Sequence, residues 1–299
     1  MTILVTGAFG QVGSSLLRKF EKSKKEIIVM DKQEKNEFSN IKKIITEITN
    51  IENLKKYKKE LKDVTTLIHL ASYITNDRDV IKSGPESVNL NIVGTINLLN
   101  YLPNLKKITF TSSYMVYGTP TKKNINENHP TNPNVVYGAS KLATEKYLQI
   151  FCKENSIKLS ILRMMGIYGV EKPHGQAIPT FIKLMSENKI PTINGTGKEK
   201  RNHLHIDDAV DSILASIKSN KSGVFNVGGK NNPSNLEIIN IINKILKKNI
   251  KPEFKKSSIS AYNFISDISK TEKDLKFKPK INIEEGIFRT IKQFENKGW

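Results

Sequence analysis

Short apolar runs and longer segments of helical periodicity alternate along the first half of the chain. The apolar runs are typical of buried strands, and they cover residues 3–6, 27–30, 44–48, 66–71, 107–110 and 159–163. Helical patterns separate them, beginning near Ser14 and covering 51–61, about 83–101 and about 135–154. Strands joined by crossovers of helix length are parallel, and such crossovers are right-handed. The pattern therefore predicts an α/β fold with a doubly wound parallel sheet, whose ligand lies at the carboxyl ends of the strands.

The composition of the chain changes after Gly169. Pro, Gly and Asn are frequent in 171–176 and 191–197, which indicates irregular connections. Two further elements are predicted, a strand at 224–227 and a helix at 235–247, and the tail from Lys251 is strongly polar until 287–294. We therefore expect residues 1–169 to form the main domain, to which the strand near 224–227 returns. Residues 170–299 are expected to form mostly a smaller, lid-like region.

A glycine-rich turn joins the first strand to the first helix. It reads Gly7-Ala8-Phe9-Gly10-Gln11-Val12-Gly13. Gly7 permits a tight turn, Gly10 lets the backbone approach a pyrophosphate, and Gly13 lets the helix pack closely on the strand. The first amides of the helix then face the phosphates. The spacing is one residue wider at its start than the common dinucleotide fingerprint, and it predicts a Rossmann domain that binds a dinucleotide.

An acid follows the second strand at the position where a dinucleotide places its adenosine ribose. Asp31 lies 18 residues after Gly13 and ends the run Ile27-Ile28-Val29-Met30. Its carboxylate accepts hydrogen bonds from ribose hydroxyls and repels a 2′-phosphate. This favours NAD over NADP, and Lys32 beside it keeps NADP open as an alternative.

A tyrosine and a lysine lie four residues apart in the helix predicted at 135–154. Residues at that spacing share one helix face, so Lys141 can lie beside the ring of Tyr137. A phenol of pKa about 10 becomes a usable base near neutral pH only where a nearby cation favours the phenolate. Thr111-Ser112-Ser113 ends a strand about two dozen residues upstream and brings hydroxyl groups to the same edge of the sheet. The sequence thus predicts a proton-transfer site.

The formal net charge is +19, which raises the question of an anionic partner. Of the 48 basic residues only five are arginine, and the lysines are spread in short clusters from Lys19 to Lys297. No recognised nucleic-acid module accompanies the charge, so the sequence does not predict nucleic-acid binding.

No apolar run approaches the roughly 20 residues of a membrane span, so no membrane partner is expected. The first strand begins at Ile3 and leaves no room before it for a signal peptide, which predicts a cytoplasmic protein. The one cysteine, Cys152, excludes an internal disulfide and a cysteine zinc site. No set of His, Asp and Glu has the spacing of metal ligands, so no metal is expected.

Taken together, these segments resemble the NAD-dependent epimerase/dehydratase family, the extended short-chain dehydrogenase/reductases typified by UDP-glucose 4-epimerase. The resemblance is densest from residue 3 to 169. Its matching positions are Gly7, Gly10, Gly13, Asp31, His69-Leu70-Ala71, Asn91-Ile92-Val93-Gly94-Thr95, Thr111-Ser112-Ser113, Val116-Tyr117-Gly118, Tyr137, Lys141, Leu162-Arg163, Tyr168-Gly169, Arg201 and His205-Ile206-Asp207-Asp208-Ala209. The resemblance implies an NAD-binding Rossmann domain over 1–169 and a smaller substrate-binding domain over most of 170–299.

The resemblance also implies roles for the site residues. Ser113, Tyr137 and Lys141 are the expected catalytic set: Lys141 binds the nicotinamide ribose and lowers the pKa of Tyr137, Tyr137 removes a hydroxyl proton, and Ser113 holds that oxygen. The residues expected to bind NAD are Gly7, Phe9, Gly10, Gln11, Val12, Gly13, Asp31, Glu47, Ile48, Leu70, Ala71, Asn91, Thr111, Tyr137, Lys141, Met164 and Met165.

The substrate side departs from the family pattern. Its expected residues are Ser113, Tyr137, Gly166, Asn194, Arg201 and Lys256. Arg201 is the expected clamp for a diphosphate, because a guanidinium binds phosphate through a fork. Gly166 replaces an asparagine, Asn194 replaces an aromatic residue, and Lys256 stands near a missing arginine. Tyr114-Met115 replaces the Asp-Glu pair of 4,6-dehydratases, which argues against that reaction.

Four further positions near the site are not expected to take part in proton transfer or metal binding. His69 lies in an apolar strand and is interpreted as a structural residue near the cofactor. His203 and His205 are expected to line the ligand site or to pack against Asp207. Glu127 lies ahead of the helix that carries Tyr137. Stabilising its loop is one of several roles that stay open for it.

The leading hypothesis is an NAD-dependent sugar-nucleotide epimerase that works through a transient ketone and acts on a small molecule, in particular a nucleotide sugar. One alternative is a net NAD(P)-dependent dehydrogenase or ketoreductase acting on a nucleotide sugar or small hydroxy substrate. A second is a non-enzymatic relative that binds RNA or a protein. By analogy with the family, a homodimer is expected through the helices near 83–101 and 135–154. The sequence leaves the sugar, the nucleotide and the pathway open.

Overall fold

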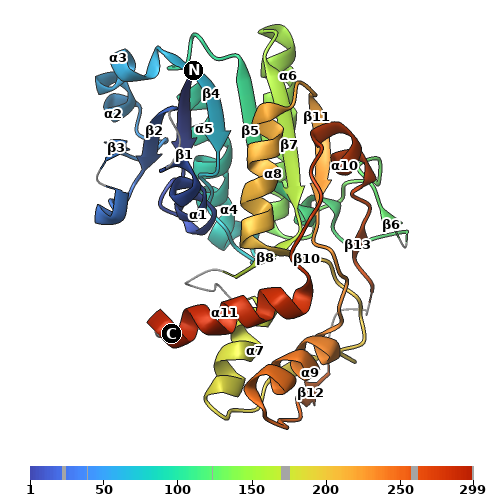
Figure 1. Cartoon of the computed structure of the whole chain (residues 1–299). Coiled ribbons are helices and arrows are strands. Elements are labelled where there is room, and N and C mark those ends of the chain that lie inside the picture. The colour runs from blue at the N-terminus through green and yellow to red at the C-terminus, as the bar shows by residue number, and fades with distance from the viewer. Residues whose placement is uncertain (22–24, 39, 123, 170–175, 257–261, 298–299) are drawn as a thin grey trace.

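A parallel sheet of seven strands forms the centre of the computed structural model (Figure 1), which describes residues 1–299 apart from 22–24, 39, 123, 170–175, 257–261 and 298–299. In sheet order the strands are β11 (Gly223–Val227), β7 (Lys158–Met164), β5 (Lys107–Ser113), β4 (Val64–His69), β1 (Thr2–Thr6), β2 (Glu26–Asp31) and β3 (Lys42–Ile45). Every adjacent pair is parallel. The predicted doubly wound parallel sheet is therefore confirmed.

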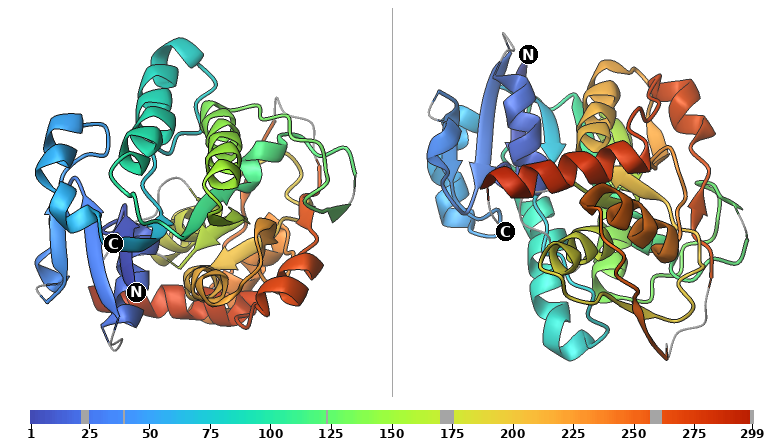
Figure 2. Two further views of the ribbon diagram at one scale, coloured as in Figure 1. Left: turned by 90° about the horizontal axis from the view of Figure 1, so that it is seen from above. Right: turned by 60° about the horizontal axis from the view of Figure 1, so that its bottom comes forward.

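The sheet has a hydrophobic core on each face, because alternate side chains of a strand point to opposite sides. In β1, Ile3 and Val5 join one core, whereas Leu4 joins the other. The first core is covered by α1 (Gln11–Phe20) and α8 (Ile206–Lys218). The second is covered by α2 (Ile51–Lys56), α3 (Lys58–Leu61), α5 (Gly94–Leu99) and α6 (Val136–Glu154). Figure 2 shows α5 and α6 on the opposite side of the sheet from α8.

A smaller body lies beyond the carboxyl ends of the strands (Figure 1). It is built from α7 (Ala177–Ser186), α9 (Asn235–Leu246) and α11 (Ile283–Lys297), which share a third core. The short strands β9 (Thr192–Asn194) and β12 (Glu253–Lys255) pair beside it. Two elements from beyond residue 169 return to the sheet, β11 at its edge and α8 on its face. The division of the chain at residue 169 stays a prediction.

Several element boundaries differ from those expected. The strand predicted at 44–48 ends at Ile45, and the helix predicted at 51–61 is interrupted at Tyr57. The helix predicted at 83–101 is a series: α4 (Val80–Val88), a π-helical turn at Asn89–Val93, and α5. Of the irregular stretch predicted at 171–176, only Gln176 lies within the described residues. The stretch at 191–197 contains β9.

Besides the helices α7 and α8 and the strand pair β9 and β12, the sequence pattern missed further short elements. These are the 3-10 turns η1 (Asn36–Phe38) and η3 (Tyr114–Tyr117), the strands β6 (Asn124–Ile125), β8 (Gly166–Tyr168), β10 (His203–His205) and β13 (Ile265–Ser266), and the helix α10 (Ser269–Leu275). The short strands pair with partners far away in the chain, β10 with β8 and β13 with β6. Within the described residues, no helix is long and apolar enough to cross a membrane.

Helix α11 reaches the short strand β8 through a contact that leaves no space for a side chain. A Cβ at Gly286 would lie 2.0 Å from the hydroxyl oxygen of Tyr168 and 2.7 Å from the ring carbon that carries it. The Tyr168 ring is itself buried and packs edge-on against the rings of His203 and His205. Gly286 therefore fixes how closely the C-terminal helix approaches β8.

We predict that Gly286→Ala destabilises the protein by about 1–3 kcal/mol, because the added methyl group overpacks this contact. The free energy of unfolding in urea measures the effect. Gly84→Ala is the matched control in another helix, where the new Cβ would lie 3.3 Å from an exposed valine side chain. There the higher helix propensity of alanine stabilises by up to about 1 kcal/mol. Equal effects of the two substitutions would contradict the prediction.

Candidate active site

The turn between β1 and α1 has no room for side chains at two of its glycines. Gly7 has a φ of +61°, and a Cβ there would lie 2.6 Å from the backbone nitrogen of Ala71. A Cβ at Gly13 would lie 2.4 Å from the carbonyl oxygen of Ala8. Gly10 precedes α1 without a side-chain cap, so backbone alone presents the first amides of the helix. This backbone cradle at a helix N-terminus is the arrangement that binds a pyrophosphate.

Asp31 ties this turn to the end of β2. One carboxylate oxygen accepts a hydrogen bond of 2.9 Å from the amide of Phe9, and the other accepts one of 3.0 Å from the amide of Gln33. Each oxygen keeps a further lone pair for a ribose hydroxyl. The ammonium of Lys32 lies 3.6 Å from the carboxylate of Glu47, so a neighbouring acid partly offsets the positive charge that favours NADP.

Other predicted cofactor residues lie at the carboxyl ends of β4, β5 and β7. They are Leu70, Ala71, Thr111, Met164 and Met165. The amide of Leu70 donates to the carbonyl of Thr6 at 3.2 Å, and the amide of Ala71 donates to the Thr6 hydroxyl at 3.3 Å. The hydroxyl of Thr111 donates to the carbonyl of His69 at 3.2 Å. These bonds fix the edge of the sheet beside the glycine turn.

Two residues predicted to bind the cofactor use their side chains within the protein. Ile48 is buried, and a Cβ at Gly94 would lie 2.7 Å from it. The side-chain nitrogen of Asn91 donates to the Ser140 hydroxyl at 2.8 Å and to the backbone carbonyl of Tyr73 at 3.1 Å. The side-chain oxygen of Asn91 accepts from the backbone amide of Tyr73 at 2.7 Å. Asn91 lies in the π-helical turn, a distortion that often marks functional sites. Its side chain joins the segment after β4 to α6.

The structural interpretation of His69 is confirmed, and Glu127 has a loop contact. The two ring nitrogens of His69 lie 2.7 Å from the Thr6 hydroxyl and 2.8 Å from the Thr95 hydroxyl. Burial lowers the pKa of His69 to about 3, so the ring is neutral and does not act as an acid or base near neutral pH. The carboxylate of Glu127 accepts a hydrogen bond of 2.7 Å from the amide of Asn226 in β11, which anchors its loop to the sheet.

Tyr137, Lys141 and Ser113 meet where the start of α6 lies against the end of β5. All three are buried, and the Lys141 ammonium lies 5.7 Å from the centroid of the Tyr137 ring. A Cβ at Gly138 would lie 2.5 Å from the carbonyl oxygen of Met115, so α6 begins directly on the turn that follows Ser113. The Ser113 oxygen accepts a 3.2 Å hydrogen bond from the Met115 amide, which leaves the hydroxyl hydrogen to donate to a ligand.

The pKa of Tyr137 shifts in the opposite direction from the one expected. Burial raises it to about 12, and hydrogen bonding to the Ser72 side chain offsets only part of that rise. Burial also lowers the pKa of Lys141 to about 7, against the carboxylate of Glu145, which raises it. For the protein by itself, burial therefore decides the direction of the shift, and the lowering of the Tyr137 pKa by Lys141 together with NAD stays a prediction. The cost of desolvating the phenolate exceeds the effect of the neighbouring cation.

Arg201 lies near the catalytic tyrosine through a cluster of aromatic rings. Its guanidinium carbon is 4.9 Å from the centroid of the Tyr262 ring. Its positive charge also acts on Tyr114, whose pKa is raised by burial and lowered by Arg201. Tyr114 packs edge-on against Phe264 at 5.0 Å and acts electrostatically on Tyr137. The structure thus brings the predicted anion clamp into the surroundings of Tyr137.

The other substrate-side residues fall in two places. Gly166 in β8 pairs with His203 in β10, and a Cβ there would lie 3.8 Å from the His203 ring nitrogen. Asn194 is exposed at the end of β9, which pairs with β12, and Lys256 follows β12 directly. The structure therefore places Asn194 and Lys256 close together in the smaller body, whereas Gly166 lies at the sheet's carboxyl edge.

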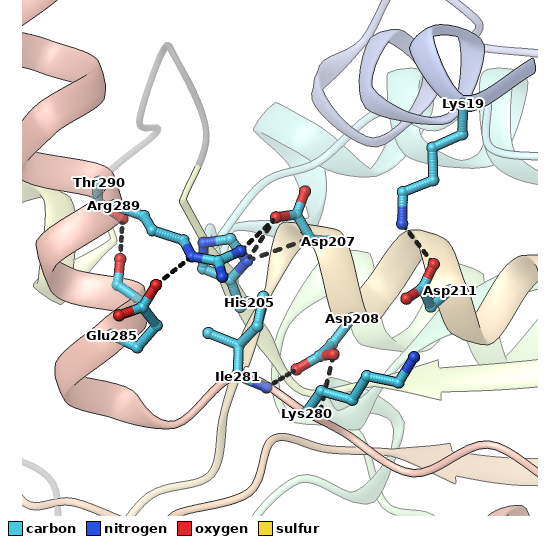
Figure 3. A network of polar contacts seen from close by, with 11 residues as sticks. Lys19, His205, Asp207, Asp208, Asp211, Lys280, Ile281, Glu285, Arg289 and Thr290 are labelled. Carbon is cyan, nitrogen blue, oxygen red and sulfur yellow. Dashed lines mark hydrogen bonds and ion pairs between the residues drawn. The ribbon is translucent and has the colours of Figure 1, made fainter. Parts of the chain in front are cut away.

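His205 packs against Asp207, one of the two roles expected for it, and it belongs to a polar network between α8 and α11 (Figure 3). The His205 ring nitrogen accepts from the Asp207 amide at 3.2 Å and caps α8. Arg289 of α11 bonds Glu285 at 2.6 Å and Asp207 at 3.3 Å. Asp208 accepts 3.0 Å hydrogen bonds from two backbone amides of the segment that precedes α11. The network fastens the C-terminal helix to the sheet domain.

Sequence reasoning missed several residues of the site. Tyr262 and Phe264 lie in a polar stretch without periodicity, so no pattern marks them. Ser72 directly follows the matched His69-Leu70-Ala71. Only the tertiary fold brings it next to Tyr137, so its position in the sequence does not mark it. Glu145 carried a signal, because it lies one helical turn beyond Lys141 on the same face.

Known proteins resemble this chain over nearly its full length. The sequence model of the NAD dependent epimerase/dehydratase family matches residues 3–228. The chain belongs to this family. It is 32% identical to a putative UDP-glucose 4-epimerase of Methanocaldococcus jannaschii, over 98% of each chain.

Solved structures of the family share the whole architecture. UDP-glucose 4-epimerase of Thermotoga maritima, solved with UDP-glucose, is 26% identical over 99% of each chain with a TM-score of 0.90. UDP-glucuronic acid 4-epimerase of Bacillus cereus, solved with UDP-glucuronic acid and NAD, is 28% identical over 99% of each chain with a TM-score of 0.89. As a member of the family, the chain is an enzyme, and NAD is its cofactor.

The glycine turn and its surroundings fit this cofactor of the family. The tight contacts at Gly7 and Gly13 leave bare backbone where a pyrophosphate approaches, and the start of α1 carries no side-chain cap. Asp31 presents a carboxylate at the end of the next strand, with lone pairs free beyond its two backbone bonds. These residues would hold the pyrophosphate and the adenosine ribose.

We predict that Asp31→Ala weakens NAD binding about tenfold or more and narrows the preference for NAD over NADP. The substitution removes the acceptor for the ribose hydroxyls and also the charge that repels a 2′-phosphate. Isothermal titration of both dinucleotides gives the two dissociation constants. Glu34→Ala removes an exposed acid three residues further on and serves as the control. An unchanged ratio of the two constants in Asp31→Ala would contradict this role.

Proposed function

We propose that the enzyme is a sugar-nucleotide 4-epimerase in which Tyr137 is the acid and base. The observation that carries the proposal is the meeting of Tyr137, Lys141 and Ser113 at the carboxyl edge of the sheet that also bears the glycine turn. This edge is where ligands of doubly wound sheets bind. The relatives solved with UDP-glucose, or with UDP-glucuronic acid and NAD, support a nucleotide sugar as the substrate class.

The proposed chemistry assigns one task to each residue. Ser113 donates its hydroxyl hydrogen to the substrate oxygen and holds it. Tyr137 takes the proton of that hydroxyl and later returns it. Lys141 keeps a positive charge on the same helix face. NAD supplies, when bound, a positive ring charge that favours the Tyr137 phenolate, and it accepts and returns the hydride of the reacting carbon. Return to the opposite face of the ketone gives the epimer.

The residues after Ser113 favour epimerisation over elimination of water. Tyr114 and Met115 stand in the 3-10 turn that follows the strand, and neither bears a carboxylate. A 4,6-dehydration needs an acid and a base to remove a hydroxyl and a proton. We therefore assign the reaction to a single carbon.

Arg201 is the proposed contact for the diphosphate of the substrate. Its guanidinium is half-buried against Tyr262, which restricts it to a fixed place near the reacting residues. A planar fork held in this way binds a phosphate through two parallel hydrogen bonds. The exposed Asn194 and Lys256 of the smaller body offer polar contacts to the nucleotide.

We predict that Tyr137→Phe lowers turnover by at least about a hundredfold, because the phenylalanine ring cannot transfer a proton. Interconversion of UDP-glucose and UDP-galactose, and of the corresponding uronates, is followed by chromatography. Tyr57→Phe, between α2 and α3, is the matched control and should leave turnover unchanged. Near-native turnover of Tyr137→Phe would overturn the assignment. Stoichiometric growth of the NADH absorbance band in the native enzyme would instead identify a net dehydrogenase.

We further propose that the enzyme acts as a homodimer through the helices on one face of the sheet. The helical series of α4, the π-helical turn and α5 lies beside α6, and these helices expose a set of large apolar side chains. The set comprises Val80, Ile81, Val88, Val93, Ile96, Tyr147 and Ile150. A contiguous apolar surface of this kind marks an association site, and most soluble oligomers pair identical surfaces.

For this face, Ile150→Asp is expected to convert a dimer into a monomer, because it buries an unpaired charge at the interface. Ile150 is 63% exposed in the single chain. Light scattering coupled to size-exclusion chromatography gives the mass of the 33.8 kDa chain and its assemblies. Ile190→Asp, at a 52% exposed position outside these helices, is the control. If native and Ile150→Asp proteins have the same mass, this surface is not the interface.

A further inference from the structure

A carboxylate lies buried behind Lys141, where the proposed chemistry assigns it no task. Glu145 belongs to α6 and is fully buried. Its two oxygens accept hydrogen bonds of 3.0 and 2.6 Å from the guanidinium of Arg163 in β7, which is the bidentate geometry of a strong ion pair. The hydroxyl of Ser112 donates to the first oxygen at 2.5 Å. Glu145 is therefore held from three elements: its own helix, β5 and β7.

The position of this ion pair relates it to the catalytic residues. Tyr137, Lys141 and Glu145 follow one another at intervals of four residues, so they form a row along one face of α6. Ser112 directly precedes Ser113, and it lies opposite Arg163 in the register of β5 and β7. The row on the helix and the pair of strands thus meet at the same place. Glu145 stands on the inner side of Lys141, away from the edge that receives the ligand.

Stability alone does not account for an ion pair at this depth. The attraction between two buried charges often fails to exceed the free energy of removing both from water, and apolar residues of similar volume are then equally stable. One guanidinium nitrogen of Arg163 is also buried without a hydrogen-bond partner. The arrangement does, however, place one fixed negative charge one helical turn from Lys141, where it raises the pKa of the buried ammonium.

We propose that Glu145, held by Arg163 and Ser112, is a positioning residue that keeps Lys141 in its charged form and in place beside Tyr137. The inference rests on the function proposed above, because it assigns Glu145 through the task of Lys141.

The other groups around Lys141 leave this task to Glu145. The ring of Phe110 in β5 lies 4.4 Å from the ammonium, and the Tyr137 ring lies 5.7 Å from it. His69 of β4 also faces Lys141, but burial lowers its pKa to about 3 and leaves it neutral. An uncharged ring cannot offset the desolvation of an ammonium as a carboxylate does.

The expected change in the Lys141 pKa follows from the balance between burial and the charge of Glu145. Burial lowers the pKa of Lys141 to about 7, and the charge of Glu145 opposes that fall. Without the carboxylate, the pKa of Lys141 falls further and the ammonium is lost near neutral pH. Tyr137 then loses the adjacent positive charge that favours its phenolate. Activity should decline on the alkaline side of the profile at a lower pH than in the native enzyme.

The test uses a double substitution, Glu145→Gln with Arg163→Met, which removes both charges and leaves neither partner buried alone. The protein is labelled with ¹³C at the lysine ε carbons, and the Lys141 signal is identified by its loss in Lys141→Met. We expect the Lys141 pKa to fall by about one unit or more in the double variant, with the melting temperature close to native. An unchanged Lys141 pKa in the folded double variant overturns the proposal.

Two further variants distinguish an effect of the charge at position 145 from a general loss of protein stability. Glu145→Asp keeps the charge and should hold the Lys141 pKa within about half a unit of native, whereas a fall as large as that of the double variant contradicts the proposal. Asp208→Asn removes an equally buried carboxylate in α8, so it should destabilise the protein without moving the Lys141 titration. A shift in that control as large as in the double variant also counts against the proposal.

The lysine titration requires no substrate, so its outcome is independent of the epimerase assay with Tyr137→Phe. If the Lys141 pKa falls in the double variant and Tyr137→Phe keeps its turnover, the effect of Glu145 on Lys141 is supported and the proposed reaction is rejected. With an active substrate in hand, the alkaline limb of the pH profile of kcat should move in the double variant by the same amount as the Lys141 pKa.

Discussion

The approach of α6 to the turn after β5 is the constraint on which the site depends. Gly138 rests on the carbonyl of Met115 so closely that no side chain fits between them. This contact sets Tyr137 at the edge of the sheet that carries Ser113, although the two residues come from different elements. A larger residue at position 138 would lift the start of the helix and move Tyr137 away from Ser113. The geometry of the proposed catalytic residues therefore follows from backbone packing.

The sequence was sufficient for the parts of the fold that depend on local patterns. The buried strands, the glycine turn and the acid after β2 each combine a run of residue types with a fixed spacing, and all are present, with β3 displaced toward the N-terminus of its predicted range. The short strands β8 and β10 escaped prediction because three residues carry no periodicity and their pairing joins distant segments. Tyr57 interrupts a pattern that looks continuous in the sequence. Tyr262 and Phe264 reach Arg201 only through tertiary packing.

The electrostatics of the site could be predicted only in part, because spacing reports which groups are neighbours and not how much water surrounds them. Tyr137 and Lys141 are indeed neighbours, but burial dominates both of their pKa values. The same limitation hid Glu145, whose position one turn beyond Lys141 is plain in the sequence. Its meaning required the knowledge that it is fully buried and paired with a strand residue.

The edge strand β11 has a consequence for how the chain acquires its structure. Residues 165–222 lie between β7 and β11 in sequence, yet these two strands are direct neighbours in the sheet. During synthesis, β7 therefore leaves the ribosome well before the strand that protects its edge, and an open strand edge is a template for pairing with other chains. The helix α8, which covers one face of the sheet, also arrives late. The sheet of the cofactor domain is thus completed only after α7 and β9 of the smaller body have been made, and its edge depends on non-local contacts, which slow folding.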